Sequence, residues 1–103
     1  MIRLILAGEL DLAFRPTFET AVADAQTDSG RLLLDLRALT LIDCANLAVV
    51  FSAAKRSRHD GSVLILLSPR GQVRRVLDLL GAPPGAAVLD PEELPSRGSQ
   101  VTV

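Results

Sequence analysis

The sequence predicts an α/β fold built on a largely parallel β-sheet. Three apolar runs of strand length, at residues 2–6, 32–36 and 63–67, are separated by segments in which apolar side chains repeat at helical spacing. Glycine and proline residues lie between these segments. Strands that alternate with helices need crossover connections, which favour parallel pairing and leave an antiparallel piece as an option at the N-terminal edge.

The composition fits one compact domain and excludes several classes of protein. The chain has 103 residues with a single cysteine and a single histidine, so it offers neither a disulfide framework nor a metal site. A net charge of -1 and the absence of Trp and Tyr argue against nucleic-acid binding. No segment approaches the roughly 20 apolar residues that cross a bilayer. We therefore expect a cytoplasmic protein with no membrane insertion.

The predicted domain extends from the first strand to a change in composition near the C-terminus. Residues 2–6 are almost continuously apolar and are closed by Gly8, which predicts a strand. Leu10 and Leu12 alternate with acids, so a short extended segment should follow. At the other end, from Pro91 onward, Pro, Glu, Ser, Gly and Gln dominate the composition. We therefore assign residues 1–90 to one domain and residues 91–103 to a loosely ordered C-terminal tail.

Two helices flank the apolar run at 32–36, which reads as a buried strand. Pro16 suits the first turn of a helix over residues 16–28, whose inner face is Phe18, Ala21, Val22 and Ala25. Asp43 can cap the second helix by accepting hydrogen bonds from free N–H groups. This helix ends in the basic residues Lys55, Arg56 and Arg58, which match the negative end of the helix macrodipole and are interpreted as a solvated helix end.

The C-terminal part of the domain repeats the pattern. Residues 63–67 predict another buried strand, and Ser68-Pro69 provides a cap followed by a proline at the first helical position. A third helix follows, with its inner face formed by Val73, Val76, Leu77 and Leu80. Gly81 ends this helix, and residues 86–89 predict a last short strand.

Five stretches, taken in order, resemble the STAS domain, the module named for sulphate transporters and anti-sigma factor antagonists. Each stretch is short, but their order and spacing match the family over about residues 2–90. They are Gly8–Asp11, Leu34–Leu36, Leu41–Asp43, Leu47–Val50 and Gln72–Gly81.

The resemblance implies a mixed sheet of four to five strands with helices packed mainly on one face. It also implies protein recognition without enzymatic activity or a cofactor. In the best-known bacterial members, the segment between the third strand and the second helix reads Asp-Ser-Ser-Gly or Asp-Ser-Thr-Gly. A kinase that is also an anti-sigma factor phosphorylates a hydroxyl there, and the unphosphorylated form captures that anti-sigma factor.

This chain departs from the family at the phosphorylated segment. Cys44 and Ala45 stand at the two hydroxyl positions, so the usual phosphoacceptor is lost. Asp11 and Asp43 match the family's acids, and Asn46 replaces the glycine, where it either meets the partner or supports the cap. The resemblance therefore implies a partner surface that this kinase chemistry does not switch. The expected partner-binding residues are Glu9, Asp11, Asp43, Asn46 and Leu47.

Cys44 has two interpretations at its position near a helix N-terminus. The favoured one is a small buried residue that fills the space of a serine. The alternative is a redox switch, because the positive end of the helix favours the thiolate.

The leading functional hypothesis is an interaction module that binds an anti-sigma factor of the ATP-binding serine-kinase type and regulates transcription. The alternative is a STAS regulatory subunit of a lipid-transport ABC complex or another multiprotein assembly. Family members usually carry a further strand before the one that leads into Gly8–Asp11, and here Met1 lies almost on that strand. Either the true start lies upstream, or the sheet has a bare edge that a partner or a second copy of the chain could cover, the second copy giving a homodimer.

Overall fold

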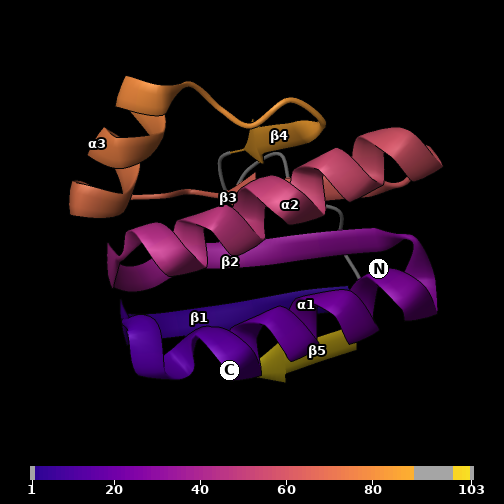
Figure 1. Cartoon of the computed structure of the whole chain (residues 1–103), viewed down its shortest axis with the longest axis horizontal. Coiled ribbons are helices and arrows are strands. Elements are labelled where there is room, and N and C mark those ends of the chain that lie inside the picture. Colours follow the sequence, from indigo (N-terminus) through magenta and orange to yellow (C-terminus); the bar gives the residue numbers. More distant parts are fainter. Residues whose placement is uncertain (1, 90–98, 103) are drawn as a thin grey trace.

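The computed structural model describes residues 2–89 and 99–102, which form one parallel sheet and the helices that cover it (Figure 1). The strand order is β4-β3-β2-β1-β5. In chain order the elements are β1 (Ile2–Leu10), the 3-10 helix η1 (Leu12–Phe14), α1 (Arg15–Ser29), β2 (Arg31–Ile42), α2 (Cys44–Asp60), β3 (Val63–Leu67), α3 (Gly71–Leu80), β4 (Ala86–Leu89) and β5 (Ser99–Thr102).

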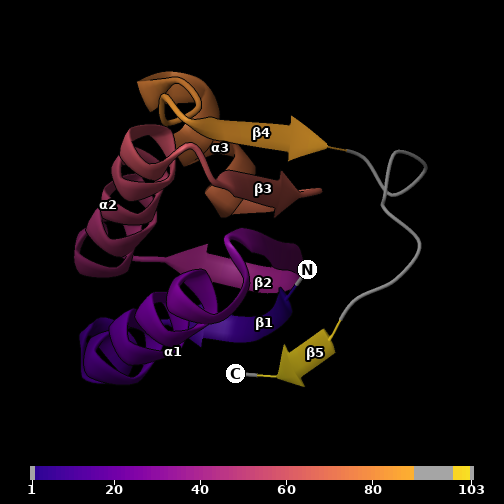
Figure 2. The ribbon, with the colours of Figure 1, turned by 90° about the vertical axis from the view of Figure 1, so that its right-hand side faces the viewer.

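The helices lie where the predicted α/β fold requires them. Figure 2 shows α1 and α2 side by side on one face of the sheet, while α3 packs against β2. The α/β fold with helices mainly on one face is therefore confirmed. In the described part of the chain, no helix combines the length and the apolar character that spanning a membrane would need.

Two details of the N-terminal segment and the sheet differ from the expectation. Every strand pair in the described residues is parallel, so the sheet is not mixed there. Leu12 belongs to the 3-10 helix η1 rather than to an extended segment, because the chain turns directly after β1 towards Pro16 at the start of α1.

The C-terminal region also differs from the expectation of a loosely ordered tail. Residues 99–102 form β5, which pairs with β1 from Ile2↔Ser99 to Ile5↔Thr102. The remaining tail residues, 91–98 and 103, lie outside the described part of the chain. Because β5 binds the backbone of residues 2–5, that edge of β1 is not bare, and the reason for expecting a homodimer there is lost.

The core follows from the alternation of side chains along β2. Leu32, Leu34 and Leu36 point towards the helices and pack in one cluster with Phe18 and Val50, all of them almost fully buried. The intervening Leu33 faces the other side of the sheet and packs with the buried side chains of Ile65 and Leu67. Burying each such side chain stabilises the fold by about 1.5–3 kcal/mol relative to exposure.

An acidic residue shares the second face of β2 with Leu33. The Asp35 side chain is only 4% exposed, and its Oδ2 accepts hydrogen bonds from Nη2 of Arg3 at 2.7 Å and Nη2 of Arg37 at 2.6 Å. Burial alone would raise the pKa of Asp35, but the hydrogen bonds from Arg37 and Arg3 outweigh it and lower the pKa to about 2. This network ties β1 to β2 on the face opposite α1 and α2.

Gly85 sets how closely the chain before β4 approaches α2. Its φ of +97° belongs to a region that favours glycine, and an added Cβ would lie 2.4 Å from the carbonyl oxygen of Ala54 and 2.8 Å from Cβ of Arg58. The absence of a side chain at Gly85 therefore lets β4 close against the C-terminal half of α2.

The Asp35 network generates a prediction about stability and pH. Because the folded-state pKa lies below the model-peptide value of 3.8, its stabilisation is present above about pH 4 and is lost as the pH falls towards about 2. Asp35→Asn should lower the free energy of unfolding at neutral pH by about 2 kcal/mol and remove this acid-dependent component. Urea unfolding at neutral and acidic pH measures both effects.

The control is Asp24→Asn, which changes an exposed carboxylate on α1 and should alter stability by less than about 0.5 kcal/mol. Equal urea midpoints for Asp35→Asn and the unmodified chain at neutral pH would contradict a stabilising role for the network.

Candidate functional site

The register of β1 and β2 brings the two family-matched acids together. The strands pair in parallel up to Leu10↔Ile42, after two irregularities in the register, so Asp11 and Asp43 leave neighbouring strands at the same edge. The backbone N–H of Asp43 also donates to the carbonyl oxygen of Leu10 at 3.1 Å. The segment η1 and the first turn of α2 therefore meet at one end of the molecule (Figure 1).

Asp43 begins α2, as the sequence predicts. Its Oδ1 accepts a hydrogen bond from the backbone N–H of Asn46 at 2.9 Å, which satisfies one of the free donors of the first helical turn. The predicted N-cap is confirmed. The same carboxylate oxygen accepts a second hydrogen bond from the Asn46 side chain at 2.9 Å.

Asn46 lies beneath the surface rather than on it. Its side chain has no solvent exposure, and Nδ2 donates to the carbonyl oxygen of Asp11 at 2.7 Å as well as to Asp43. The interpretation in which Asn46 meets the partner is therefore wrong, and its alternative, support of the cap, fits the structure. Leu47 is also almost completely buried and packs in the core, so it offers little surface to a partner.

The exposed part of the site combines carboxylates with an apolar side chain. Glu9 and Asp11 are exposed, Asp43 is half-buried, and none of them forms an ion pair with a side chain that the structure describes. Leu12 follows Asp11 in η1 and is 67% exposed. This exposed apolar residue is not among the site residues expected from the sequence. The Pro16 signal for a helix start indicated that the chain turns shortly after Asp11, which would have argued against an extended Leu12.

Cys44 is exposed at the first position of α2, so the expectation of a buried residue is wrong. At this position the side chain points outward, because the inner face of the first turn is taken by Asn46 and Leu47. Ala45 is half-buried. The two positions without a hydroxyl therefore lie beside Asp43 at the rim of the same surface.

In the described part of the chain, no group of three His, Cys, Asp or Glu side chains is placed to hold a metal ion. Glu9, Asp11 and Leu12 are exposed in neighbouring positions of the chain, and Asn46 joins the backbone of Asp11 to the side chain of Asp43. We call this surface the acidic docking face and define it as Glu9, Asp11, Leu12, Asp43 and Cys44.

Comparisons with known proteins place this geometry in context. The family model described as the STAS domain matches residues 2–85. No sequence among curated proteins matches the chain. Among solved structures, the anti-sigma factor antagonist SpoIIAA in its unphosphorylated form aligns with a TM-score of 0.68 and 20% identity, covering 84% of this chain and 77% of that chain.

Two further structures share the fold. The Bacillus cell fate determinant SpoIIAA in its phosphorylated form has a TM-score of 0.68 and 22% identity, and the alignment covers 87% of this chain and 84% of that chain. The protein TM1081 of Thermotoga maritima has a TM-score of 0.71 and 23% identity, with 82% of this chain and 77% of that chain covered.

The buried amide of Asn46 generates a prediction for this site. Asn46→Ala removes both hydrogen bonds that Nδ2 donates and should lower the free energy of unfolding by about 1–3 kcal/mol. Because the Asp11 carbonyl oxygen loses a bond, the turn at η1 should also open more often. The N–H of Phe14, which donates to the same oxygen at 3.1 Å, should then exchange faster with deuterium.

Ser52→Ala is the matched control, since Ser52 is exposed on α2 and its removal should change stability by less than about 0.5 kcal/mol. If Asn46→Ala lowers stability but leaves exchange at Phe14 unchanged, the amide does not hold η1.

Proposed function

The chain belongs to the STAS domain family, and from that premise we propose that it is a regulatory protein-interaction module that acts as an anti-sigma factor antagonist. Its partner is an anti-sigma factor or a related serine kinase, in the cytoplasm of a bacterium. The observation that carries this proposal is the acidic docking face, in which the exposed Leu12 directly follows the exposed Asp11, whose carbonyl oxygen accepts a hydrogen bond from the buried Asn46. The protein has no catalytic role in this proposal.

The proposed mechanism is competitive binding through the acidic docking face. Leu12 is the apolar anchor that loses its water on contact, and well-packed apolar side chains at the centre of an interface supply much of the binding energy. The exposed carboxylates of Glu9 and Asp11 precede it in the chain and steer a partner with a basic surface. An anti-sigma factor held in this way is no longer available to its sigma factor.

Control by phosphorylation at the usual place is absent from this mechanism. A phosphate would add about -1.5 to -2 charges and a bulky group beside Asp43, and would disrupt the fit of a partner that packs closely against the face. Cys44 and Ala45 offer no hydroxyl to accept it. Binding is therefore set by the amount of the protein, and the exposed thiol of Cys44 remains the one reactive side chain at the face.

A second candidate function is a regulatory subunit of a lipid-transport ABC complex. Leu79 and Leu80 at the end of α3 favour it, because they are 85% and 61% exposed on an element outside the acidic docking face. Exposed apolar residues that lie together are typical of a contact with another protein. In this case the partner would cover α3.

Substitutions at two leucines of similar exposure distinguish these two candidate functions. Leu12 and Leu80 have similar exposure, 67% and 61%, but lie on η1 and α3. We expect a tagged chain to retain an ATP-binding anti-sigma factor from its own cells, identified by mass spectrometry. Leu12→Asp should weaken the binding of the purified partner at least about tenfold, in the range of a single interface hot spot. Leu80→Asp should leave it unchanged.

The opposite result, loss of binding in Leu80→Asp and full binding in Leu12→Asp, would contradict the proposal. Recovery of a transporter ATPase with that pattern would establish the second candidate. Thermal unfolding of both variants confirms that each one is folded, and neither leucine is part of the core.

A further inference from the structure

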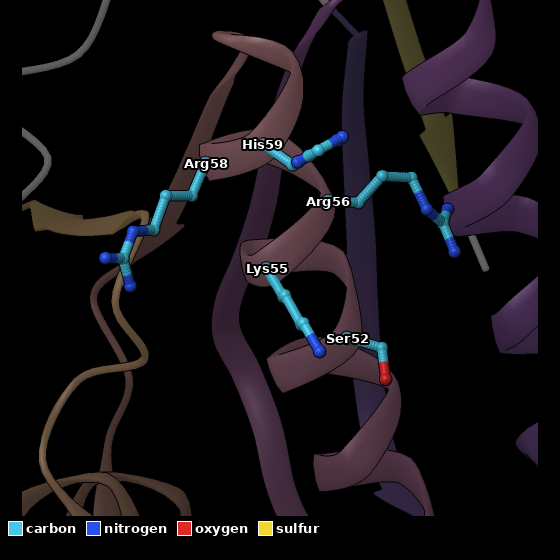
Figure 3. Close-up of a pocket in the computed structure, with 5 residues that line it drawn as sticks. All are labelled: Ser52, Lys55, Arg56, Arg58 and His59. Atoms are coloured by element: carbon cyan, nitrogen blue, oxygen red, sulfur yellow. The ribbon is translucent and has the colours of Figure 1, made fainter.

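The outward face of the C-terminal half of α2 gathers basic side chains. Lys55, Arg56, Arg58 and His59 are all exposed and, together with Ser52, line an open cavity of about 700 Å³ (Figure 3). We call these four residues the basic end of α2. The chain as a whole has a net charge of -1, so this concentration of positive charge is local.

The nearest acid in the sequence, the exposed Asp60, directly follows His59 and is not paired with any of these side chains. Among the described side chains, none of the four forms an ion pair. Arg56 donates from Nη1 to Oε1 of Gln26 on α1 at 2.8 Å, which orients the guanidinium without cancelling its charge. Glu19 borders the groove between α1 and α2 together with Arg56, but the two are not paired there. Lys55, Arg56 and Arg58 therefore remain available to an external anion.

Stabilisation by the helix macrodipole explains the positions of only some of these basic residues. Its influence is confined to the last turn, which contains Arg58 and His59. Lys55 and Arg56 lie before that turn and gain little from it. Their presence on the same exposed surface needs a further explanation.

The four side chains spread apart instead of converging. Figure 3 shows Arg56 and His59 directed towards α1, Arg58 directed away from them towards β4, and Lys55 beside Ser52 between the two directions. A small anion would be held by donors that point at one place. Donors that spread over a helix face match an extended surface with several negative charges.

The surroundings of the basic end offer room for such a surface. A groove of about 380 Å³ runs between α2 and the chain before β4 and is lined by Phe51, Ser52, Lys55, Arg58 and Pro84. Phe51 is half-buried and packs against the core, so the groove has an apolar floor beneath its cationic wall. A polypeptide segment can lay apolar atoms into this groove and keep its acids at the rim.

We propose that the basic end of α2 is the second half of the docking surface and that it binds an acidic segment of the partner protein. This inference rests on the proposed function, because it assigns the charge of the partner that docks on the acidic face. From Asp43 to Arg58 the helix advances about 22 Å, so the N-cap of α2 adjoins the acidic docking face, whereas Lys55, Arg56 and Arg58 lie towards its other end, which closes with Asp60. A partner with the opposite order of charges can dock in one direction only.

The positions of the acidic and basic side chains also argue against a nucleic acid or an anionic membrane as the partner. A nucleic acid would bring phosphates against Glu9 and Asp11 if it followed α2, and the chain has no Trp or Tyr on which bases could stack. An anionic membrane would meet the same acids. A protein partner avoids this conflict because its surface charge can change sign along the length of the helix.

The test is an NMR titration of the purified full chain with a blocked oligoglutamate peptide at low salt. The peptide should shift the amide signals of residues 51–59, and Lys55→Glu with Arg58→Glu should weaken its binding at least about tenfold. Lys55→Gln with Arg58→Gln, which keeps helix-forming side chains, should weaken it to a smaller extent. Raising the salt concentration should weaken the binding of the unmodified chain.

The matched control reverses two other exposed arginines, Arg70→Glu with Arg75→Glu at α3, which changes the net charge by the same amount. Peptide binding by this variant should equal that of the unmodified chain. Equal weakening in both charge-reversal variants would overturn the inference, because it would reflect net charge alone. Tighter binding of inorganic phosphate, or of phosphatidylserine vesicles, than of the peptide at these residues would also overturn it.

A second measurement separates this inference from the proposed function. The retained partner is titrated with the Lys55→Glu, Arg58→Glu variant and with Leu12→Asp. Loss of binding in both variants supports the inference and the proposed function together. Loss in Leu12→Asp alone overturns the inference and leaves the proposed function standing, whereas full binding by both variants rejects the acidic docking face itself.

Discussion

The buried side-chain amide of Asn46 is the contact on which the acidic docking face depends. It joins the carbonyl oxygen of Asp11 to the carboxylate of Asp43, and so fixes the turn after β1 against the first turn of α2. Each acceptor also has a second donor, the N–H of Phe14 for the Asp11 oxygen and the N–H of Asn46 for Asp43, so the amide of Asn46 is what links the two segments to each other. Leu12 directly follows Asp11, so the hydrogen bond from Asn46 fixes the start of the turn that carries Leu12. A preformed surface of this kind loses less entropy when a partner binds.

A second network joins β1 and β2, the two strands that lead to Asp11 and Asp43. Asp35 on β2 pairs with Arg3 on β1 on the face of the sheet that lies away from α1 and α2, and the N–H of Asp43 bonds to Leu10 where the strands end. The register of the pair decides which residues emerge at the edge of the sheet, and a slip of one residue would turn each side chain to the other face. The two networks therefore protect the geometry of the docking face.

Much of the fold could be predicted from local sequence patterns, and the failures have physical causes. The apolar runs at 32–36 and 63–67 lie in β2 and β3, and Asp43 caps α2 as expected. The strand β5 was missed because Ser99–Thr102 is short and polar, and such a strand is specified by its partner β1. The burial of Asn46 and the exposure of Cys44 depend on which side of α2 faces Asp11, which the spacing of apolar residues did not decide.

The most direct test of the account is the reactivity of Cys44 in the free chain and in complex with the retained partner. Cys44 is the only cysteine of the chain and lies exposed within the acidic docking face, so iodoacetamide reports on this surface without any substitution. The account predicts that the partner slows alkylation of Cys44 at least about tenfold, as expected for a side chain covered by a specific interface. An unchanged rate under saturating partner would show that binding takes place elsewhere on the molecule.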